Sequence, residues 1–211
     1  MVGTLADAYD PRCVRCSLSA WASSVCVPGR GNPDGRLLVL GEAPGAKEDE
    51  RNSPFVGPAG ELLDEALAEA GLAERAFRTN VVKCRPPRNR EPEHAEREAC
   101  RMYLELEFDR VRPLVALALG SHALASLVPL AGTVSRSRGK WIAAPMPGLE
   151  QGCWVVPTWH PAYVLRRRQI AGPEFADDLA TVRRAFAEWE RSGYVASVYS
   201  GRSACVGEEK R

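Results

Sequence analysis

RLLVLGEAPG, residues 36–45, decides the fold of this chain. Four apolar residues fill positions 37–40 without alternating with polar ones, and they lead directly into a turn with two glycines. An unbroken apolar run of this length is typical of a strand that is buried on both faces of a parallel sheet. The turn then brings Glu42 to the edge of the sheet, where it either projects into a ligand site or lies solvated on the surface.

Strand-like and helix-like segments alternate on both sides of this stretch. Amphipathic helices are predicted at 58–71, 91–108, 121–128 and 173–190, and further strands at 77–83, 113–120, 138–144 and 153–160. The alternation predicts an α/β fold: a three-layer α/β/α sandwich with a central, mostly parallel four-stranded sheet. We expect a single domain over residues 1–192, followed by a polar tail at 193–211 without regular structure. In such a sheet a site belongs at the carboxyl ends of the strands.

The composition is that of a soluble globular protein. The chain has 211 residues, of which 45% are hydrophobic and 26% charged, and its net charge is only +1. It contains no apolar run near the roughly 18 residues of a membrane span and no basic, apolar leader at its start. We therefore expect a cytoplasmic protein with no membrane partner, in which cysteines serve as metal ligands more often than in disulfides.

Four of the seven cysteines have the spacing of a metal centre. Cys13 and Cys16 form a C-x-x-C pair, Cys84 follows an apolar strand, and Cys100 lies in a predicted helix. Thiolates in this pattern bind zinc or an iron–sulfur cluster, and one close pair plus two single cysteines is less typical of zinc. Buried cysteines without a ligand are the alternative. The other three cysteines have no nearby partner in the sequence and are left out of the set: Cys26, Cys153 and Cys205.

Three other residues at strand ends or beside glycine turns are candidates for ligand contacts. Asn80 is unfavourable in an apolar strand unless its amide has a partner, which is either neighbouring backbone or a ligand. His160 ends a strand and is either a structural hydrogen-bonding group or part of the site. Phe55, among Pro and Gly, either belongs to the core or stacks on a planar ligand.

Basic residues concentrate in three short segments despite the near-neutral total, at 83–90, 136–140 and 166–168. Each segment adjoins one of the candidate site segments. Solvated surface charge is the ordinary interpretation of any one such segment, but three segments at these places are harder to explain in that way.

Four segments together resemble a known enzyme family. They are GEAPGAKEDERNSPFVGPAGELLDEAL from Gly41, TNVVKCRPPRNREP from Thr79, RGKW from Arg138 and WHPAYVLR from Trp159. Their order and spacing are similar to those of the family-4 uracil-DNA glycosylases, the bacterial and archaeal type that carries one [4Fe–4S] cluster, and the likeness runs from about residue 13 to 188. The resemblance implies a monofunctional DNA repair glycosylase that flips uracil out of DNA and hydrolyses its N-glycosidic bond, leaving an abasic site.

The resemblance also implies roles for individual residues. As catalytic residues, Glu42 places the attacking water or stabilises the cationic sugar, and His160 donates a hydrogen bond to uracil O2. Uracil-binding residues are Ala43, Glu48, Phe55 and Asn80, with Asn80 on the Watson–Crick edge, Phe55 on the ring and Glu48 excluding the thymine methyl group. Ala43 stands where some relatives have Gly, which implies a larger share of water positioning for Glu42.

The implied DNA and cluster contacts complete the set. DNA-binding residues are Lys83, Arg85, Arg88, Leu165 and Arg166, of which Leu165 resembles the residue that wedges into the duplex. Cluster ligands are Cys13, Cys16, Cys84 and Cys100, and because hydrolysis transfers no electrons we expect the cluster to brace the fold. The partner is uracil-containing DNA, single- or double-stranded, and we expect a monomer. Two other functions stay open: a glycosylase with a different base preference, and a non-catalytic DNA-binding module.

Overall fold

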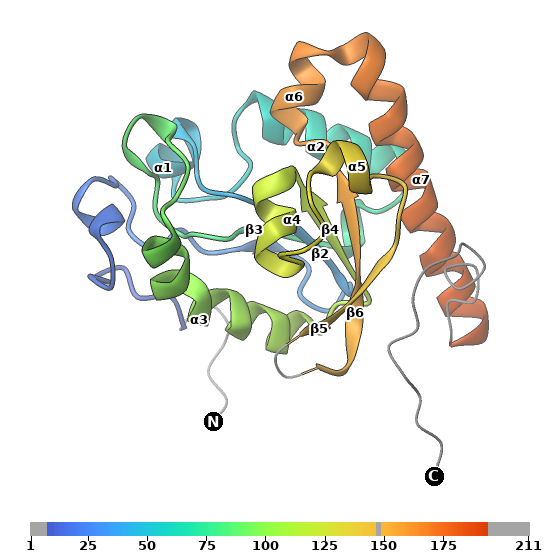
Figure 1. Cartoon of the computed structure of the whole chain (residues 1–211), viewed down its shortest axis with the longest axis horizontal. Coiled ribbons are helices and arrows are strands. Elements are labelled where there is room, and N and C mark those ends of the chain that lie inside the picture. Colours follow the sequence, from blue (N-terminus) through green and yellow to red (C-terminus); the bar gives the residue numbers. More distant parts are fainter. Residues whose placement is uncertain (1–7, 147–148, 194–211) are drawn as a thin grey trace.

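The computed structural model describes residues 8–146 and 149–193 and has one mixed sheet at its centre (Figure 1). The sheet has six strands in the order β1-β3-β2-β4-β6-β5. Their bounds are Arg30–Gly31 (β1), Leu37–Gly41 (β2), Ala76–Asn80 (β3), Val115–Leu119 (β4), Ile142–Met146 (β5) and Leu149–Thr158 (β6). The pairs β3–β2, β2–β4 and β4–β6 are parallel, whereas β1 and β5 pair antiparallel at the two edges.

The expected four-stranded sheet is therefore wrong in its count, although the α/β architecture is confirmed. β1 has only two residues, in a stretch rich in Gly, Pro and Asn, so it carries no periodic pattern that could predict it. β5 corresponds to the strand predicted at 138–144, which was not counted in the four-stranded sheet, and it joins the sheet as the antiparallel partner of β6.

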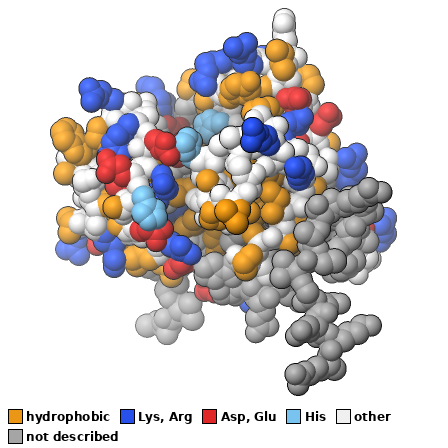
Figure 2. All heavy atoms as spheres, viewed as in Figure 1, with side chains coloured by type: hydrophobic (Ala, Val, Ile, Leu, Met, Phe, Trp, Pro, Cys, Tyr) orange, Lys and Arg blue, Asp and Glu red, His pale blue; other side chains and the backbone are white. Residues whose placement is uncertain are grey.

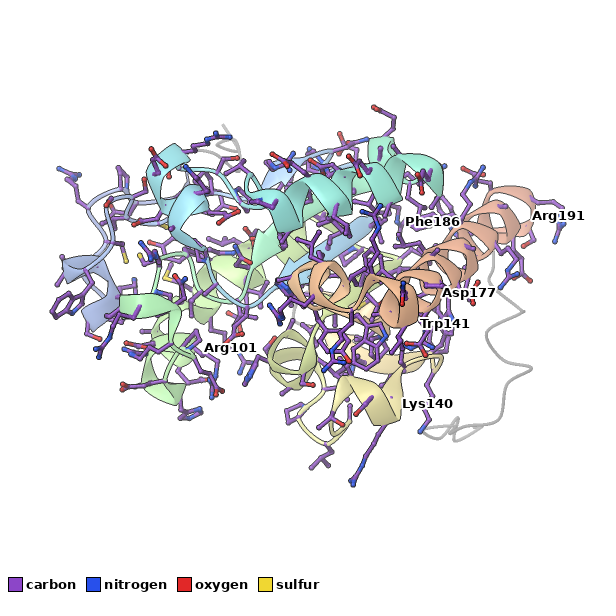
Figure 3. All side chains as sticks on the ribbon, turned by 90° about the horizontal axis from the view of Figure 1, so that it is seen from above. Arg101, Lys140, Trp141, Asp177, Phe186 and Arg191 are labelled. Atoms are coloured by element: carbon purple, nitrogen blue, oxygen red, sulfur yellow. The ribbon has the colours of Figure 1, made fainter. Side chains whose placement is uncertain are left out.

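Helices cover both faces of the sheet, which gives the three predicted layers (Figure 1). The longer ones are α2 (Pro58–Glu69), α3 (His94–Val111), α4 (Ser121–Leu127) and α7 (Arg168–Ser192). Leu38 and Leu40 of β2 pack in a core with α3 and α4, while Leu37 and Val39 pack in a second core with α2 and α7. Phe186 of α7, labelled in Figure 3, belongs to this second core. Both faces of β2 are buried, as its unbroken apolar run predicts.

Short elements that the sequence did not predict connect the strands to the longer helices. They are α1 (Ala46–Arg51), α5 (Val134–Ser137), α6 (Pro161–Arg166) and the 3-10 turns η2 (Ser17–Ala20), η3 (Ala73–Arg75) and η4 (Pro87–Asn89). Each is too short to show a helical period. α7 begins five residues before the predicted start, so that Pro173 lies inside it.

The amino-terminal segment packs on the α3 face and is held by a buried polar group at its centre. The Tyr9 ring stacks on Tyr103 of α3 with 6.0 Å between ring centroids, and the Tyr9 hydroxyl donates to the carboxylate of Glu107. The same carboxylate accepts from Thr79 on β3 at 2.7 Å. This contact brings the first cysteine pair against α3.

No described helix combines the length and the apolar content needed to cross a bilayer. Most of the predicted tail, residues 194–211 with Cys205, lies outside the described residues.

Candidate active site and thiol pocket

The carboxyl ends of β2 and β3 bring three of the predicted site residues together. Gly41 pairs with Asn80 across the two strands, and the chain continues from Gly41 into Glu42. A Cβ atom on Gly41 would lie 2.4 Å from Asn80 Oδ1 and 2.7 Å from Phe55 Cζ. The amide of Asn80 and the ring of Phe55 therefore pack directly over the Gly41 backbone, and only glycine leaves room for both.

The amide group of Asn80 has no partner among the described residues, although the residue is nearly buried. It is 5% exposed, and no hydrogen bond joins its amide group to another residue in the part of the chain that the structure describes. The amide atoms are not among the side-chain atoms that are fully buried without a partner, so they keep some contact with solvent. The amide is thus available to a ligand that enters beside Phe55.

Phe55 is held in a strained backbone conformation by a residue that the sequence analysis missed. Its φ is 55°, in the left-handed region, which is costly for a non-glycine residue. The Arg30 guanidinium donates to the carbonyl oxygens of Pro54 at 2.7 Å and Phe55 at 2.8 Å, and it pairs with Asp64 of α2 at 2.7 Å. No local sequence pattern predicts the role of Arg30, because its partners lie 24 to 34 residues further along the chain.

The carboxylate of Glu48 holds together the two backbone segments that precede α1 and α2, the second of which follows Phe55. Oε2 accepts from Gly45 N at 3.1 Å, and Oε1 accepts from Val56 N and Gly57 N at 3.0 Å each. Gly45 and Gly57 are the N-caps of α1 and α2, so the carboxylate sits at two helix N-termini, where negative charge is stabilised. Glu48 braces the wall beside Phe55, and its contact with C5 of a base stays a prediction.

His160 caps helix α6 and is held as a neutral ring. Its Nδ1 accepts from Ala162 N at 3.2 Å, which leaves the proton of the neutral imidazole on Nε2. Burial, together with the nearby Arg166 and against the opposing effect of Glu48, lowers the pKa of His160 to about 4. The site therefore contains a neutral histidine whose free nitrogen is a hydrogen-bond donor.

Two hydrogen bonds to α7 fix the strand end that carries His160. Thr158 Oγ1 donates to Asp178 at 2.7 Å, and the Trp159 indole donates to Glu174 at 2.6 Å. Arg138 from the second basic segment binds the same two carboxylates, at 2.9 and 3.0 Å. Arg138 therefore stabilises the strand end that carries His160, and its guanidinium is paired with carboxylates of the protein.

Glu42 lies half-buried among charged neighbours. Its carboxylate, a carboxylate oxygen of Glu91 and a ring nitrogen of His122 lie within 4.8 Å of one another, and His122 Nδ1 is 2.8 Å from Glu91. Burial raises the pKa of Glu42, Glu91 raises it further, and His122 and Arg97 oppose this rise. Figure 2 shows histidine and acidic side chains side by side on this face of the molecule.

A cleft of about 390 Å³ between α3 and α4 opens next to this charged group. Glu91 and His122 line it, whereas Asn80, Phe55 and His160 do not. The cleft therefore lies beside the charged group around Glu42, and Asn80, Phe55 and His160 lie outside its lining.

The four predicted cluster cysteines converge on one small pocket, which we call the thiol pocket. Its lining includes Cys13, Cys16, Cys26, Cys84 and Cys100. Backbone amides point at two of the sulfurs: Cys26 N lies 3.3 Å from Cys84 Sγ, and Lys83 N lies 3.2 Å from Cys100 Sγ. Converging sulfur donors with N–H···S contacts fit a thiolate-bound metal centre. Cys26 has no nearby partner in the sequence, but a loop whose course the sequence does not reveal brings it to this pocket.

Lys83 does not face DNA, so this predicted phosphate contact is wrong. Its side chain is 1% exposed, and its ammonium lies 2.6 Å from Glu107 Oε2 and 2.7 Å from Thr79 Oγ1. It also donates to the carbonyl oxygen of Asn80 at 2.8 Å. The buried carboxylate of Glu107 draws it inward, and Lys83 thereby fixes the end of β3.

Comparison with known proteins agrees with this geometry. The family model of the uracil DNA glycosylase superfamily matches residues 28–183. This chain belongs to that superfamily. Proteins named type-4 uracil-DNA glycosylase are 40% identical in Pyrobaculum aerophilum, over 80% of this chain and 86% of the relative, and 42% identical in Thermotoga maritima, over 74% and 80%. A type-5 uracil-DNA glycosylase of Thermus thermophilus is 36% identical over 51% of this chain and 55% of its own. The longer matches place the chain in the type-4 group.

The remaining predicted DNA contacts of this superfamily member lie at its surface. Leu165 is 41% exposed on α6, and Arg166 beside it is exposed. Arg85 is partly exposed and donates to Asn89 at 2.8 Å, while Arg88 is exposed with a left-handed φ of 55°. All four are accessible to a partner, and their contact with DNA stays a prediction.

Proposed function

We propose that this chain is a DNA repair enzyme that excises uracil from DNA by hydrolysing the bond between the base and deoxyribose. The observation that carries the proposal is the unpartnered amide of Asn80 packed beside the Phe55 ring over Gly41, at the carboxyl ends of the strands. A base inside a duplex cannot reach such a site, so the nucleotide has to leave the stack before it binds.

Asn80 and Phe55 recognise the base. The Asn80 amide donates to uracil O4 and accepts from N3–H, a pattern that cytosine reverses at both positions. Phe55 stacks on the ring, and Arg30 holds it in the conformation that this requires. Glu48 stabilises the loop beside them and keeps the wall close to C5, which excludes a thymine methyl group.

His160 stabilises the charge that develops on the leaving base. Cleavage leaves a uracil anion and an oxocarbenium-like sugar. The ring is neutral with its proton on Nε2, so it donates a hydrogen bond to O2 and keeps its own proton. A preorganised donor of this kind lowers the barrier by roughly 3 kcal/mol.

Glu42 acts on the sugar side. An ionised carboxylate at this position orients the attacking water and stabilises the positive charge on the sugar. Its raised pKa makes it a better acceptor for the water proton near neutral pH. Ala43 offers no polar side chain to share this task.

Arg85, Arg88, Leu165 and Arg166 hold the DNA. Leu165 occupies the space that the flipped nucleotide leaves, and the arginines contact phosphates on either side. Contacts of this type make binding sensitive to salt and indifferent to flanking sequence.

Cys13, Cys16, Cys84 and Cys100 hold the proposed [4Fe–4S] cluster, which supplies covalent ties between the amino-terminal segment and the residues that follow β3. The thiol pocket and its amide contacts support this assignment. Lys83 contacts both regions: its amide reaches Cys100 Sγ, and its ammonium holds the carbonyl oxygen of Asn80. The cysteines thereby brace the base-binding strand, and the hydrolysis itself uses no electron transfer.

Uracil release from labelled oligonucleotides tests the proposal. The substrates carry U opposite G, U opposite A, or U in a single strand, with hypoxanthine and xanthine duplexes beside them. We expect release of uracil and a loss of roughly 10²–10³-fold in kcat for His160→Ala. Glu42→Ala is expected to lose on the order of 10²–10⁴-fold, while the exposed controls His94→Ala and Glu50→Ala keep wild-type rates.

The panel also separates the alternatives. Excision of hypoxanthine or xanthine without uracil release would mean a glycosylase with another base preference. Salt-dependent DNA binding without release of any base would mean a non-catalytic module.

A further inference from the structure

Cys26 is a fifth thiol in a pocket for which only four are needed. It is 3% exposed and lines the thiol pocket together with the four predicted cluster ligands. The other buried cysteine outside the predicted set, Cys153, lies on β6 and does not line the pocket. Cys153 fills space in the sheet, whereas Cys26 has its sulfur among other sulfurs.

The backbone holds Cys26 in an unusual conformation at this place. Its φ is 60°, in the left-handed region that non-glycine residues seldom adopt. The same residue directs its amide at Cys84 Sγ, and Val27 N next to it donates to Lys83 O at 2.8 Å. These contacts fix the residue against the segment that carries Cys84.

Cys13 is the predicted ligand that Cys26 is best placed to replace. Cys13, Cys26 and Tyr103 line the same pocket, and the hydroxyl of Tyr103 interacts with the thiols of both cysteines. Cys13 is partly exposed on the amino-terminal segment, whereas Cys84 and Cys100 are buried. Cys13 can therefore leave the pocket with less disruption of the core than either of those two.

We propose that Cys26 is an alternate ligand of the cluster that takes over the iron site of Cys13; this rests on the proposed [4Fe–4S] cofactor. In the exchange the Cys13 Sγ–Fe bond breaks and a Cys26 Sγ–Fe bond forms. The thiol proton of Cys26 passes to the Cys13 thiolate, or to solvent where residue 13 has no thiol. Iron keeps its oxidation state, and no further reactant is needed.

Iron and acid-labile sulfide content of the full chain, purified without oxygen, tests this exchange. The proteins are wild type, Cys13→Ala, Cys26→Ala, the double variant, and Cys153→Ala as a matched control. We expect about four iron atoms per chain in wild type and in each single variant. The double variant is expected to hold at least about tenfold less iron, because only three thiols remain. The reduced Cys13→Ala protein should also have an electron paramagnetic resonance spectrum distinct from that of wild type.

Each other outcome overturns the exchange. A Cys13→Ala protein that has as little iron as the double variant, or that is recovered only in insoluble form, shows that Cys26 does not replace Cys13. Iron at the wild-type level in both Cys13→Ala and the double variant shows that a group other than Cys26 replaces Cys13. Wild-type protein without iron contradicts the proposed cofactor itself, while uracil release measured on the same sample tests the glycosylase function separately.

Discussion

The two sides of the site are built in opposite ways. On the β3 side, Asn80 is buried and its strand end is held by the Lys83–Glu107 pair, both nearly inaccessible to solvent. On the other side, Glu42 is half-buried, and its neighbours Glu91 and His122 are about half exposed. The difference teaches that the side proposed to recognise the base is fixed by the core, whereas Glu42, proposed to place the water, is set by surface charges that solvent and salt can modulate.

Lys83→Met tests the rigid side and should have the largest effect. The change leaves the carboxylate of Glu107 buried without its cation, which costs about 3–5 kcal/mol in the free energy of unfolding. Chemical denaturation measures this loss. Arg85→Met, in the same basic segment but partly exposed, should cost less than about 1 kcal/mol. Equal losses for the two variants would contradict the buried position of Lys83.

Gly41→Ala tests the close contact between Asn80 and Phe55. The new methyl group would lie 2.4 Å from Asn80 Oδ1 and 2.7 Å from Phe55 Cζ, so one of the two side chains has to move. We expect kcat/KM for uracil release to fall about 100-fold, equivalent to about 2.7 kcal/mol. Gly172→Ala in α7 is the control, since its Cβ meets nothing nearer than 3.8 Å. Unchanged kcat/KM in the Gly41→Ala variant would show that the base does not bind beside Asn80 and Phe55.

His122→Ala tests the open side through pH. His122 holds the pKa of Glu42 down against burial and Glu91, so its removal raises that pKa further. The Glu42 carboxylate is then protonated over a wider acidic range, and the acid limb of the single-turnover rate moves to higher pH. We expect a loss of up to about tenfold below neutrality and none at alkaline pH.

His94→Ala is the control for this profile, and Arg97 stays in place in both variants. His160, with its pKa lowered to about 4, stays neutral across most of the same range. The fall of the single-turnover rate at acidic pH therefore reflects protonation of Glu42. An identical pH profile for His122→Ala and wild type would show that His122 does not influence the pKa of Glu42.

Arg88→Ala should have the smallest effect. A surface arginine that contacts one phosphate contributes about one unit to the slope of log affinity against log salt. We expect that slope to decrease by about one and the rate of excision at saturating DNA to stay the same. Arg184→Ala, exposed on α7, should leave the slope unchanged. If Arg88→Ala keeps the wild-type slope of log affinity against log salt, Arg88 does not contact a DNA phosphate.

The sequence predicted those features that depend on local pattern. Glu42, Asn80 and His160 were proposed as site residues because each follows or ends an apolar run, and parallel strands bring such ends to one edge. Lys83 was misplaced because its partner Glu107 lies 24 residues away on another element, so the basic segment alone could not show which side chain turns inward. Arg30 and Cys26 lie in loops without a period, and only tertiary contacts bring them to Phe55 and to the thiol pocket.

The capping bond between His160 and Ala162 makes one mechanical unit of the histidine and helix α6. Leu165 lies on the same six-residue helix, one turn beyond the amide that orients the imidazole. If Leu165 wedges into a duplex as proposed, that contact acts on the same helix that orients the His160 imidazole. Parting of the strands and alignment of the proposed hydrogen-bond donor would then be coupled through one six-residue helix.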